Sequence, residues 1–301
     1  MSGKMIKILL GAGAAAGAAT MGAGAYFARK LVRPHTFSLE EEKKWEYEHG
    51  LWGNYDQIPC TNYMVVGKDG CVLHCEYAEA NPGSRKVVIL THGYTSNRYG
   101  MVKYVGVYAR LGFNCILYDC RGHGENVPAP CSIGNLEAAD LLQVIEDAYR
   151  RFGEEIELGL HGESMGSSAS LSVLKYHPKV KFVVADCGFA SLYDLMKVIY
   201  GRRHLAFLRT PTNCMMRKLY HNDMRKTCAR DALKGNQIPI CLIHGTDDTF
   251  IPVENSDELA DATAGYQEVH KIKGADHAKA RSVIGEDKYL QIVKEFLEHI
   301  S

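Results

Sequence analysis

The stretch 158–167, with the sequence Leu-Gly-Leu-His-Gly-Glu-Ser-Met-Gly-Ser, constrains the fold more than any other part of this chain. A short apolar run leads into the pattern G-x-S-x-G, and a helix-forming run follows it. The pattern predicts a strand that ends in a sharp turn and passes directly into a helix. Such a turn strains its central residue, Ser164, and brings backbone so close that only glycine fits at Gly162 and Gly166.

Ser164 would then stand clear of the sheet, facing the N–H groups of the first helical turn. A serine hydroxyl is a weak nucleophile unless a base takes its proton and hydrogen-bond donors stabilise the oxyanion that forms. The pattern also recurs by chance in glycine-rich chains, where it marks an ordinary turn. The rest of the chain therefore has to supply the partners.

Apolar strands alternate with amphipathic helices through most of the sequence. We predict strands at 86–91, 115–118, 158–163, 182–185, 238–244 and 267–272, and helices at 102–111, 141–152 and 288–300. This alternation indicates a parallel sheet covered on both faces, in which ligands bind beyond the carboxyl ends of the strands. An antiparallel hairpin, 63–66 with 72–77, precedes it because Asp69-Gly70 is a turn signal.

Residues 1–34 differ in composition from the rest. An uncharged run of mainly Ala and Gly, 8–28, lies between Lys4 and Lys7 and the basic residues at 29, 30 and 33. The run is long enough to span a bilayer, and its glycine spacing suits close packing of helices in a membrane. We therefore expect a single-pass membrane anchor, with the following basic residues favouring a cytoplasmic main domain. Secretion after cleavage of a signal peptide near 23–25 is the alternative.

The segment 35–59 reads as a connector helix. Ser38 is its predicted cap with Glu41 reaching back, and Trp45, Tyr47, Leu51 and Trp52 are its predicted packing residues. Residues 60–301 form the main domain. Within it, 187–236 breaks the alternation with helical patches at 192–200 and 215–220, which predicts a lid that sets substrate size and excludes water.

Composition excludes several classes of protein. Lys and Arg number 35, as do Asp and Glu, and no basic run is interleaved with aromatic residues, so we expect no nucleic-acid partner. The ten cysteines include no C-x-x-C pair and no histidine placed to complete a zinc site, so we expect no metal. Several fall inside predicted strands, which favours free thiols in a reducing compartment over a disulfide framework. The sequence does not indicate an oligomeric state.

Four motifs follow one another in an order that carries a resemblance. They are His92-Gly93-Tyr94, Gly162-Glu163-Ser164-Met165-Gly166, His244-Gly245-x-x-Asp248-x-x-Ile251-Pro252 and Gly274-Ala275-Asp276-His277-Ala278. From about residue 63 to residue 300 the chain resembles the α/β-hydrolase-fold serine hydrolases, whose chain order is Ser, acid, His. The resemblance implies a mostly parallel central sheet, helices on both faces and a small helical lid. Within the family, the chain looks most like bacterial esterases or lipase-like hydrolases with a short N-terminal anchor.

The resemblance also implies roles for particular residues. Ser164 is the implied nucleophile, His277 the general base and then acid, and Asp248 the carboxylate that orients and stabilises the imidazole. The backbone N–H groups of Met165 and Tyr94 are the implied oxyanion hole.

Some assignments stay open on the residues alone. Asp247 and Asp186 are rivals for the acid. The family spacing selects Asp248, while Asp247 reads as a turn residue. Glu163 is either a structural elbow residue or a functional one. His92 and His244 each precede a glycine, and we expect them to bond to nearby backbone.

The resulting prediction is a serine hydrolase that cleaves carboxylic esters or thioesters through a Ser164 acyl-enzyme. The expected partners are a small-molecule acyl substrate and, through the anchor, a membrane, and no cofactor is expected. The alternatives are a peptidase or amidase with the same three residues, or a catalytically silent member that binds a ligand or partner.

Overall fold

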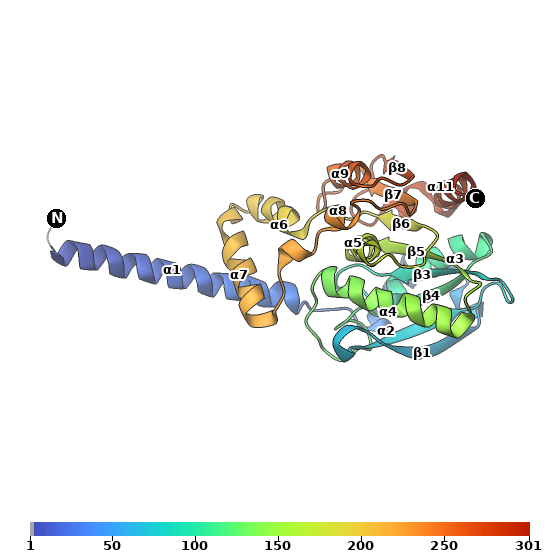
Figure 1. The fold of residues 1–301 in the computed structure, drawn as a ribbon, viewed down its shortest axis with the longest axis horizontal. Helices are drawn as coiled ribbons and strands as arrows, with labels where there is room; N and C mark the ends of the chain where they lie inside the picture. Colours follow the sequence, from blue (N-terminus) through green and yellow to red (C-terminus); the bar gives the residue numbers. More distant parts are fainter. Residues whose placement is uncertain (1–2) are drawn as a thin grey trace.

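The protein is built around one eight-stranded sheet, seen in a computed structural model that describes residues 3–301, with backbone only for residues 3–14 (Figure 1). The strands are β1 (Cys60–Val66), β2 (Val72–Ala78), β3 (Lys86–Thr91), β4 (Asn114–Tyr118), β5 (Glu157–Glu163), β6 (Val183–Asp186), β7 (Ile240–Gly245) and β8 (Gln267–Ile272). Their spatial order is β1-β2-β4-β3-β5-β6-β7-β8. The strands from β4 to β8 in this order are all parallel.

The first two strands form the predicted hairpin. β1 pairs antiparallel with β2, and β2 pairs antiparallel with β4, so the hairpin extends the parallel sheet at one edge. Asp69 and Gly70 both have positive φ, 58° and 77°, which is why an Asp-Gly pair occupies the turn.

Helices cover both faces of the sheet. Along β3, Val87 and Ile89 join one hydrophobic cluster while Val88 and Leu90 join the other, as the alternation of side chains along a strand requires. The first cluster includes residues of α4 (Asn135–Phe152), α5 (Met165–Ser172) and α9 (Glu254–Ala262). The second includes residues of α3 (Val102–Arg110), α10 (Ala280–Ile284) and α11 (Glu286–His299). The predicted fold class, a mostly parallel sheet with helices on both faces, is confirmed.

The segment between β6 and β7 is helical. It contains α6 (Leu192–Gly201), α7 (Arg209–Tyr220) and α8 (Ala229–Ala232). In Figure 1, α6 and α7 stand away from the sheet, beside the end of α1 (Gly3–Val32) that joins the domain.

The prediction of a membrane anchor is wrong. Residues 3–32 form one continuous helix, yet within residues 3–301 no helix combines the length and the apolarity needed to cross a bilayer. The physical reason is composition, because the small side chains of Ala and Gly add little apolar surface per turn. Residues 1 and 2 of the predicted anchor segment, 1–34, lie outside the described residues, whereas its uncharged run, 8–28, lies within them.

The end of α1 is docked on the protein instead. Ala28 and Val32 are fully buried, and the backbone N–H of Cys131 donates to the carbonyl of Val32 at 2.8 Å. A Cβ at Gly24 would lie only 2.8 Å from the backbone of Pro211 in α7. The glycine therefore permits close helix packing, here against α7 rather than within a membrane.

The connector helix, α2 (Leu39–Glu48), has the predicted capping box between Ser38 and Glu41. Its buried face differs from the prediction. Trp52 is buried and Trp45 half-buried, but Tyr47 is 47% exposed, whereas Glu42 and Glu46 are 8% and 1% exposed. A helix that turns two glutamates inward is unusual, because burying a carboxylate is unfavourable unless it is paired.

Candidate active site

The turn at Ser164 has the strained geometry that its sequence predicts. Ser164 has φ 56° and ψ −113°, a conformation that non-glycine residues rarely adopt. A Cβ at Gly162 would lie 2.2 Å from the carbonyl oxygen of Gly166, and a Cβ at Gly166 would lie 2.0 Å from that of Thr91. Backbone packing therefore requires both glycines and fixes Ser164 between β5 and α5.

The structure brings together the three side chains that the sequence singled out. The Oγ of Ser164 lies 2.9 Å from Nε2 of His277, and Nδ1 of His277 lies 2.7 Å from Oδ2 of Asp248. Ser164 follows β5, Asp248 follows β7 and His277 follows β8, so all three lie at the carboxyl edge of the sheet. The serine and the carboxylate are buried, while the His277 side chain is 23% exposed. This arrangement can pass a proton from hydroxyl to imidazole.

Asp248 is held as a carboxylate. Its Oδ1 accepts hydrogen bonds from the backbone N–H groups of Phe250 (2.8 Å) and Ile251 (2.7 Å), and Nε2 of His244 lies 3.3 Å from its Oδ2. Burial by itself would raise the pKa of Asp248, but hydrogen bonds from His244, His277 and Ile251 outweigh it and hold the pKa well below its usual range. The ionised carboxylate requires Nδ1 of His277 to carry its proton and leaves Nε2 free to accept one.

The two rival acids lie elsewhere. Asp247 is exposed and accepts a hydrogen bond from the Thr246 hydroxyl at 2.7 Å. Asp186 is buried and accepts from the hydroxyl of Tyr289 at 2.9 Å, and burial raises its pKa to about 6. Among the described side chains, Asp248 is the carboxylate that hydrogen-bonds the ring of His277.

The loop after β3, which carries Tyr94, passes beside the serine. A Cβ at Gly93 would lie 3.5 Å from the Cβ of Ser164. Nδ1 of His92 lies 2.7 Å from the carbonyl of Gly93, and its Nε2 accepts from the N–H of Cys120 at 2.8 Å. Burial lowers the pKa of His92 to about 3, so the ring is neutral with its proton on Nδ1. Because a trans peptide directs its N–H opposite to its C=O, this bond orients the N–H of Tyr94.

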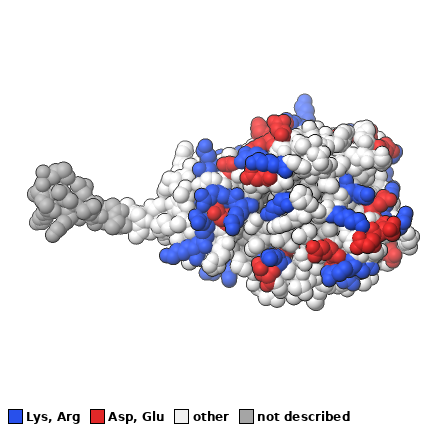
Figure 2. Space-filling view, viewed as in Figure 1, with Lys and Arg blue, Asp and Glu red and all other residues white. Residues whose placement is uncertain are grey.

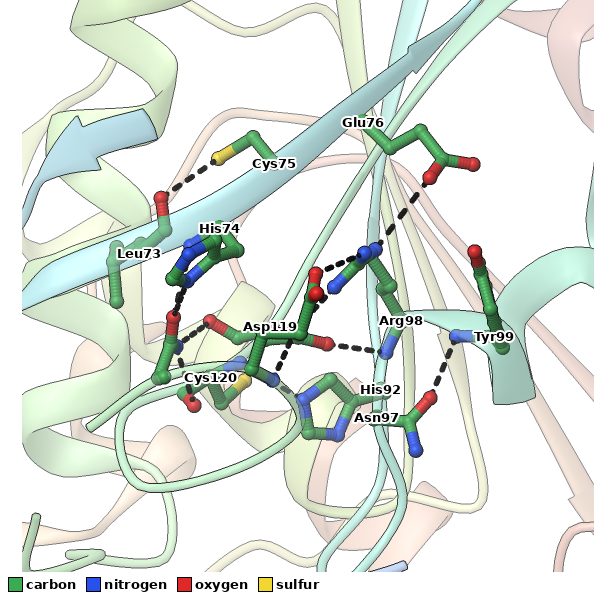
Figure 3. Close-up of polar contacts among 12 residues, drawn as sticks. Leu73, His74, Cys75, Glu76, His92, Asn97, Arg98, Tyr99, Asp119 and Cys120 are labelled. Atoms are coloured by element: carbon green, nitrogen blue, oxygen red, sulfur yellow. Dashed lines mark hydrogen bonds and ion pairs between the residues drawn. The ribbon is translucent and has the colours of Figure 1, made fainter. Parts of the chain in front are cut away.

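A buried ion cluster ties the same loop to the sheet (Figure 3). Asp119, fully buried after β4, pairs with the guanidinium of Arg98 and accepts from the Arg98 backbone N–H at 2.8 Å. Nε of Arg98 lies 3.6 Å from Glu76 of β2. Asn97 accepts from the N–H of Tyr99 at 3.0 Å. These contacts hold the loop 92–98 in one position relative to Ser164.

An apolar cavity of about 370 Å³ opens onto Ser164. Its lining includes Tyr94 and Met165, the two residues whose N–H groups were predicted to form the oxyanion hole. The walls come from α6 and α1, with Leu195, Met196 and Ile199 from the former and Tyr26, Phe27 and Leu31 from the latter. The hydroxyl of Tyr94 donates to the carbonyl of Leu31 at 2.9 Å and so fastens α1 to the site.

The rim of this cavity is basic. Lys30 and Arg203 line it, and both side chains are exposed. Figure 2 shows Lys and Arg gathered where α1 meets α6 and α7, while charges of both signs mix over the rest of that face.

Glu163, whose role was open, faces away from the apolar cavity. Its Oε2 lies 2.6 Å from Nζ of Lys103 and accepts from the hydroxyl of Tyr104 at 2.7 Å. Lys103 is buried on α3. The pair lines a second cavity, about 300 Å³, which His277 also lines.

One group of side chains has the composition of a metal site. The ligand atoms of Cys187, Asp248 and His277 lie within 4.8 Å of one another. Burial raises the pKa of the Cys187 thiol, so the thiol keeps its proton, and both ring nitrogens of His277 already have partners. These donors do not fit a metal ion well, and the expected absence of a metal stays a prediction.

Sequence reasoning missed two contributions to the site. Tyr26 and Phe27 of α1 line the apolar cavity, although the run around them read as a membrane span. Glu42 and Glu46 of α2 line the second cavity, although only Trp45, Tyr47, Leu51 and Trp52 were predicted to pack against the domain. Aromatic residues at the end of an Ala/Gly run were the available signal for α1, and α2 offered none.

Two family models match overlapping parts of the chain. One, described as "Serine aminopeptidase, S33", matches residues 82–193, and the other, described as "Serine hydrolase (FSH1)", matches residues 158–278. The fold is the α/β-hydrolase fold, and these matches support the class of serine hydrolases with this fold.

The individual proteins that this chain resembles have low sequence identity to it. The chain is 25% identical to "Uncharacterized protein YqkD" of Bacillus subtilis over 308 residues, covering 99% of each chain. It is 26% identical to alpha/beta hydrolase domain-containing protein 17C of Xenopus tropicalis, covering 87% of this chain and 76% of that protein. Among solved structures, the Pyrococcus furiosus esterase Pf2001 is similar with a TM-score of 0.66 and 22% identity, covering 82% of this chain and 94% of the esterase.

Proposed function

We propose that the protein hydrolyses carboxylic esters or thioesters with an apolar acyl group, through an acyl-enzyme on Ser164. The single observation that carries this proposal is the apolar cavity that opens onto the serine and is walled by α6 and α1. A cavity with these walls excludes water and favours an aliphatic or aromatic acyl chain.

The proposed cycle uses the hydrogen bonds described above. Ser164 Oγ attacks the acyl carbonyl while Nε2 of His277 takes its proton, and the N–H groups of Met165 and Tyr94 stabilise the oxyanion. His277 then protonates the leaving alcohol or thiol. A water molecule deprotonated by the same imidazole attacks the acyl-enzyme and releases the acid. Asp248 stabilises the imidazolium in both halves of the cycle.

In this proposal the segment 187–236 acts as a lid, and α1 completes it. Leu195 and Met196 of α6 face Phe27 and Leu31 of α1 across the same cavity. The distance between these two helices would set the length of acyl chain that the site accepts.

Labelling with a fluorophosphonate probe tests the nucleophile. Mass spectrometry should locate the adduct on Ser164, and Ser164→Ala should not be labelled. Folded wild-type protein that stays unlabelled would favour the catalytically silent alternative and overturn the proposal.

An amide substrate is the second candidate, because one matching family model is described as a serine aminopeptidase. p-Nitrophenyl esters, acyl thioesters and peptide anilides offered to the same preparation distinguish the two. Turnover confined to anilides would replace the ester proposal by the amidase.

A further inference from the structure

The second cavity, beside His277, carries an inference that rests on the proposed function and extends it to the leaving group. This cavity is lined by Glu42, Trp45 and Glu46 of α2, by Lys103 and Glu163 beneath them, and by His277 and Lys279. Its walls are acidic and aromatic, in contrast to the apolar cavity in front of Ser164.

The two glutamates are the feature that needs an explanation. Glu42 and Glu46 are 8% and 1% exposed, and the Oε2 atom of each has no hydrogen-bond partner among the described residues. A buried carboxylate oxygen without a donor is unfavourable, so each such group calls for an explanation, and a bound ligand that donates to it is one. Their i,i+4 spacing places both on one face of α2, toward the cavity.

The charges of Lys103 and Arg281 act on Glu46, but each has its own ion-pair partner, Glu163 and Glu286 respectively. Nζ of Lys103 forms its ion pair with Oε2 of Glu163, at 2.6 Å. Lys279 lies over the ring of Trp45, with Nζ 4.6 Å from the ring centroid. Three carboxylates, of Glu42, Glu46 and Glu163, therefore share this cavity with two lysines, the buried Lys103 and the half-buried Lys279.

We infer that this cavity is a subsite for a leaving group that carries a protonated amine, bound by Glu42 and Glu46. The position of the cavity relative to the reacting atoms supports the leaving-group side. Ser164, Tyr94 and Met165 line the apolar cavity, whereas His277, which must hand a proton to the leaving oxygen or sulfur, lines the acidic one.

The charge state of the pocket agrees with this geometry. Burial raises the pKa of Glu42 to about 7, although a hydrogen bond from Ser96 and the charge of Lys103 oppose the shift. Burial likewise raises the pKa of Glu46 to about 7. An ammonium group would favour the ionised form of both. Glu163, His277 and Lys279 are the other titratable groups that face them.

A matched pair of esters tests the subsite. In 5-aminopentyl butanoate and hexyl butanoate, the acyl group is the same and a protonated amine replaces a methyl group at the far end of the leaving alcohol. With butanoate release measured by chromatography at pH 8, kcat/KM should favour the amino ester by about tenfold, equivalent to about 1.4 kcal/mol. Glu46→Gln should bring the ratio close to one.

Glu48→Gln is the control, because Glu48 is on the same helix with its side chain 60% exposed, and it should keep the wild-type ratio. Equal turnover of the two esters by wild-type protein would overturn the subsite and leave the ester hydrolase intact. An unchanged ratio in Glu46→Gln would also overturn it.

A binding measurement separates the subsite from catalysis and covers a Glu46→Gln variant that fails to fold. In Ser164→Ala protein, 5-aminopentan-1-ol should raise the melting temperature, and hexan-1-ol at the same concentration should not. If the wild-type protein hydrolyses neither ester, the proposed function is overturned. The shift in melting temperature then tests the subsite on its own. Equal shifts from both alcohols, or no shift from either, would overturn it.

Discussion

Replacing Arg98 by Met removes the only positive charge that the buried cluster of Figure 3 contains among its labelled residues. The Arg98 side chain is 4% exposed, and the side chains of its partners Asp119 and Glu76 are 0% and 5% exposed. Methionine approximates the length of the arginine stem and is easily packed, so the main effect is the loss of the charge. The backbone N–H of Arg98 still donates to Asp119 in the variant.

The expected loss of stability follows from this burial. Breaking a buried pair by removing one partner costs about 3–5 kcal/mol, because the remaining charge is left uncompensated. For a chain of this size the loss corresponds to a fall in melting temperature on the order of 10 °C. The cluster also holds the loop 92–98 beside Ser164, so kcat on a p-nitrophenyl ester should fall as well.

Urea unfolding followed by circular dichroism measures the loss. Arg110→Met is the matched control, because Arg110 pairs with Asp287 on the surface, with side chains 51% and 87% exposed, and this variant should lose much less stability than Arg98→Met. Arg98→Met with Asp119→Asn should recover part of the stability, since a neutral amide is easier to bury. The reasoning is refuted if the two single variants lose equal stability, or if the double variant is no more stable than Arg98→Met.

Three further outcomes are expected. Asp248→Asn should fold normally but lose about 10³- to 10⁴-fold in kcat, measured with an ester substrate, and a loss under tenfold would remove the carboxylate from the proposed mechanism. Gly24→Val should lose about 1–3 kcal/mol of stability in thermal unfolding, because its Cβ meets the backbone of α7. Gly17→Val, with nothing within 4 Å of the added Cβ, should not show this loss. Equal losses in the two variants would contradict the docking of α1. The raised pKa of Glu42 and Glu46 means that the folded state binds more protons than the unfolded state between pH 4.5 and about 7, so their contribution is full below pH 4.5 and is lost as pH rises through 7. Urea titrations should therefore show a flatter decline of stability across this window in Glu42→Gln with Glu46→Gln, and an unchanged decline would contradict the assigned burial.

Much of the sheet and of the candidate site could be predicted because local pattern and tertiary structure agree there. The continuous apolar run of β3 was predicted with the bounds it has, since a strand buried on both faces leaves no polar position to blur it. The elbow glycines were predictable because their requirement is local, set by backbone that passes within a few residues. The spacing around Asp248 was likewise local, because its carboxylate accepts from residues 250 and 251.

The errors arose where a partner lies far away in the sequence. An Ala/Gly helix reads the same whether it packs in a membrane or against α7, and the residue that decides, Pro211, comes almost two hundred positions after Gly24. Glu42 and Glu46 were not singled out from the sequence, because charged residues at helical spacing usually form a solvent-exposed face. What turns them inward is a cavity assembled from α3 and the loop after β8, which no local pattern on α2 encodes.

The docking of α1 has a consequence for how the protein is made. α1 is synthesised before α7, and the strands β1 to β6 are synthesised between the two. Until α7 has been made, the surface of α1 around Gly24 and Ala28 lacks its partner. Contacts between segments this far apart in the sequence form late in folding. The apolar cavity beside Ser164 can therefore form only after α7 has been made, and Asp248 and His277 are made later still, so the cavity and the three side chains of the candidate site form only near the end of synthesis.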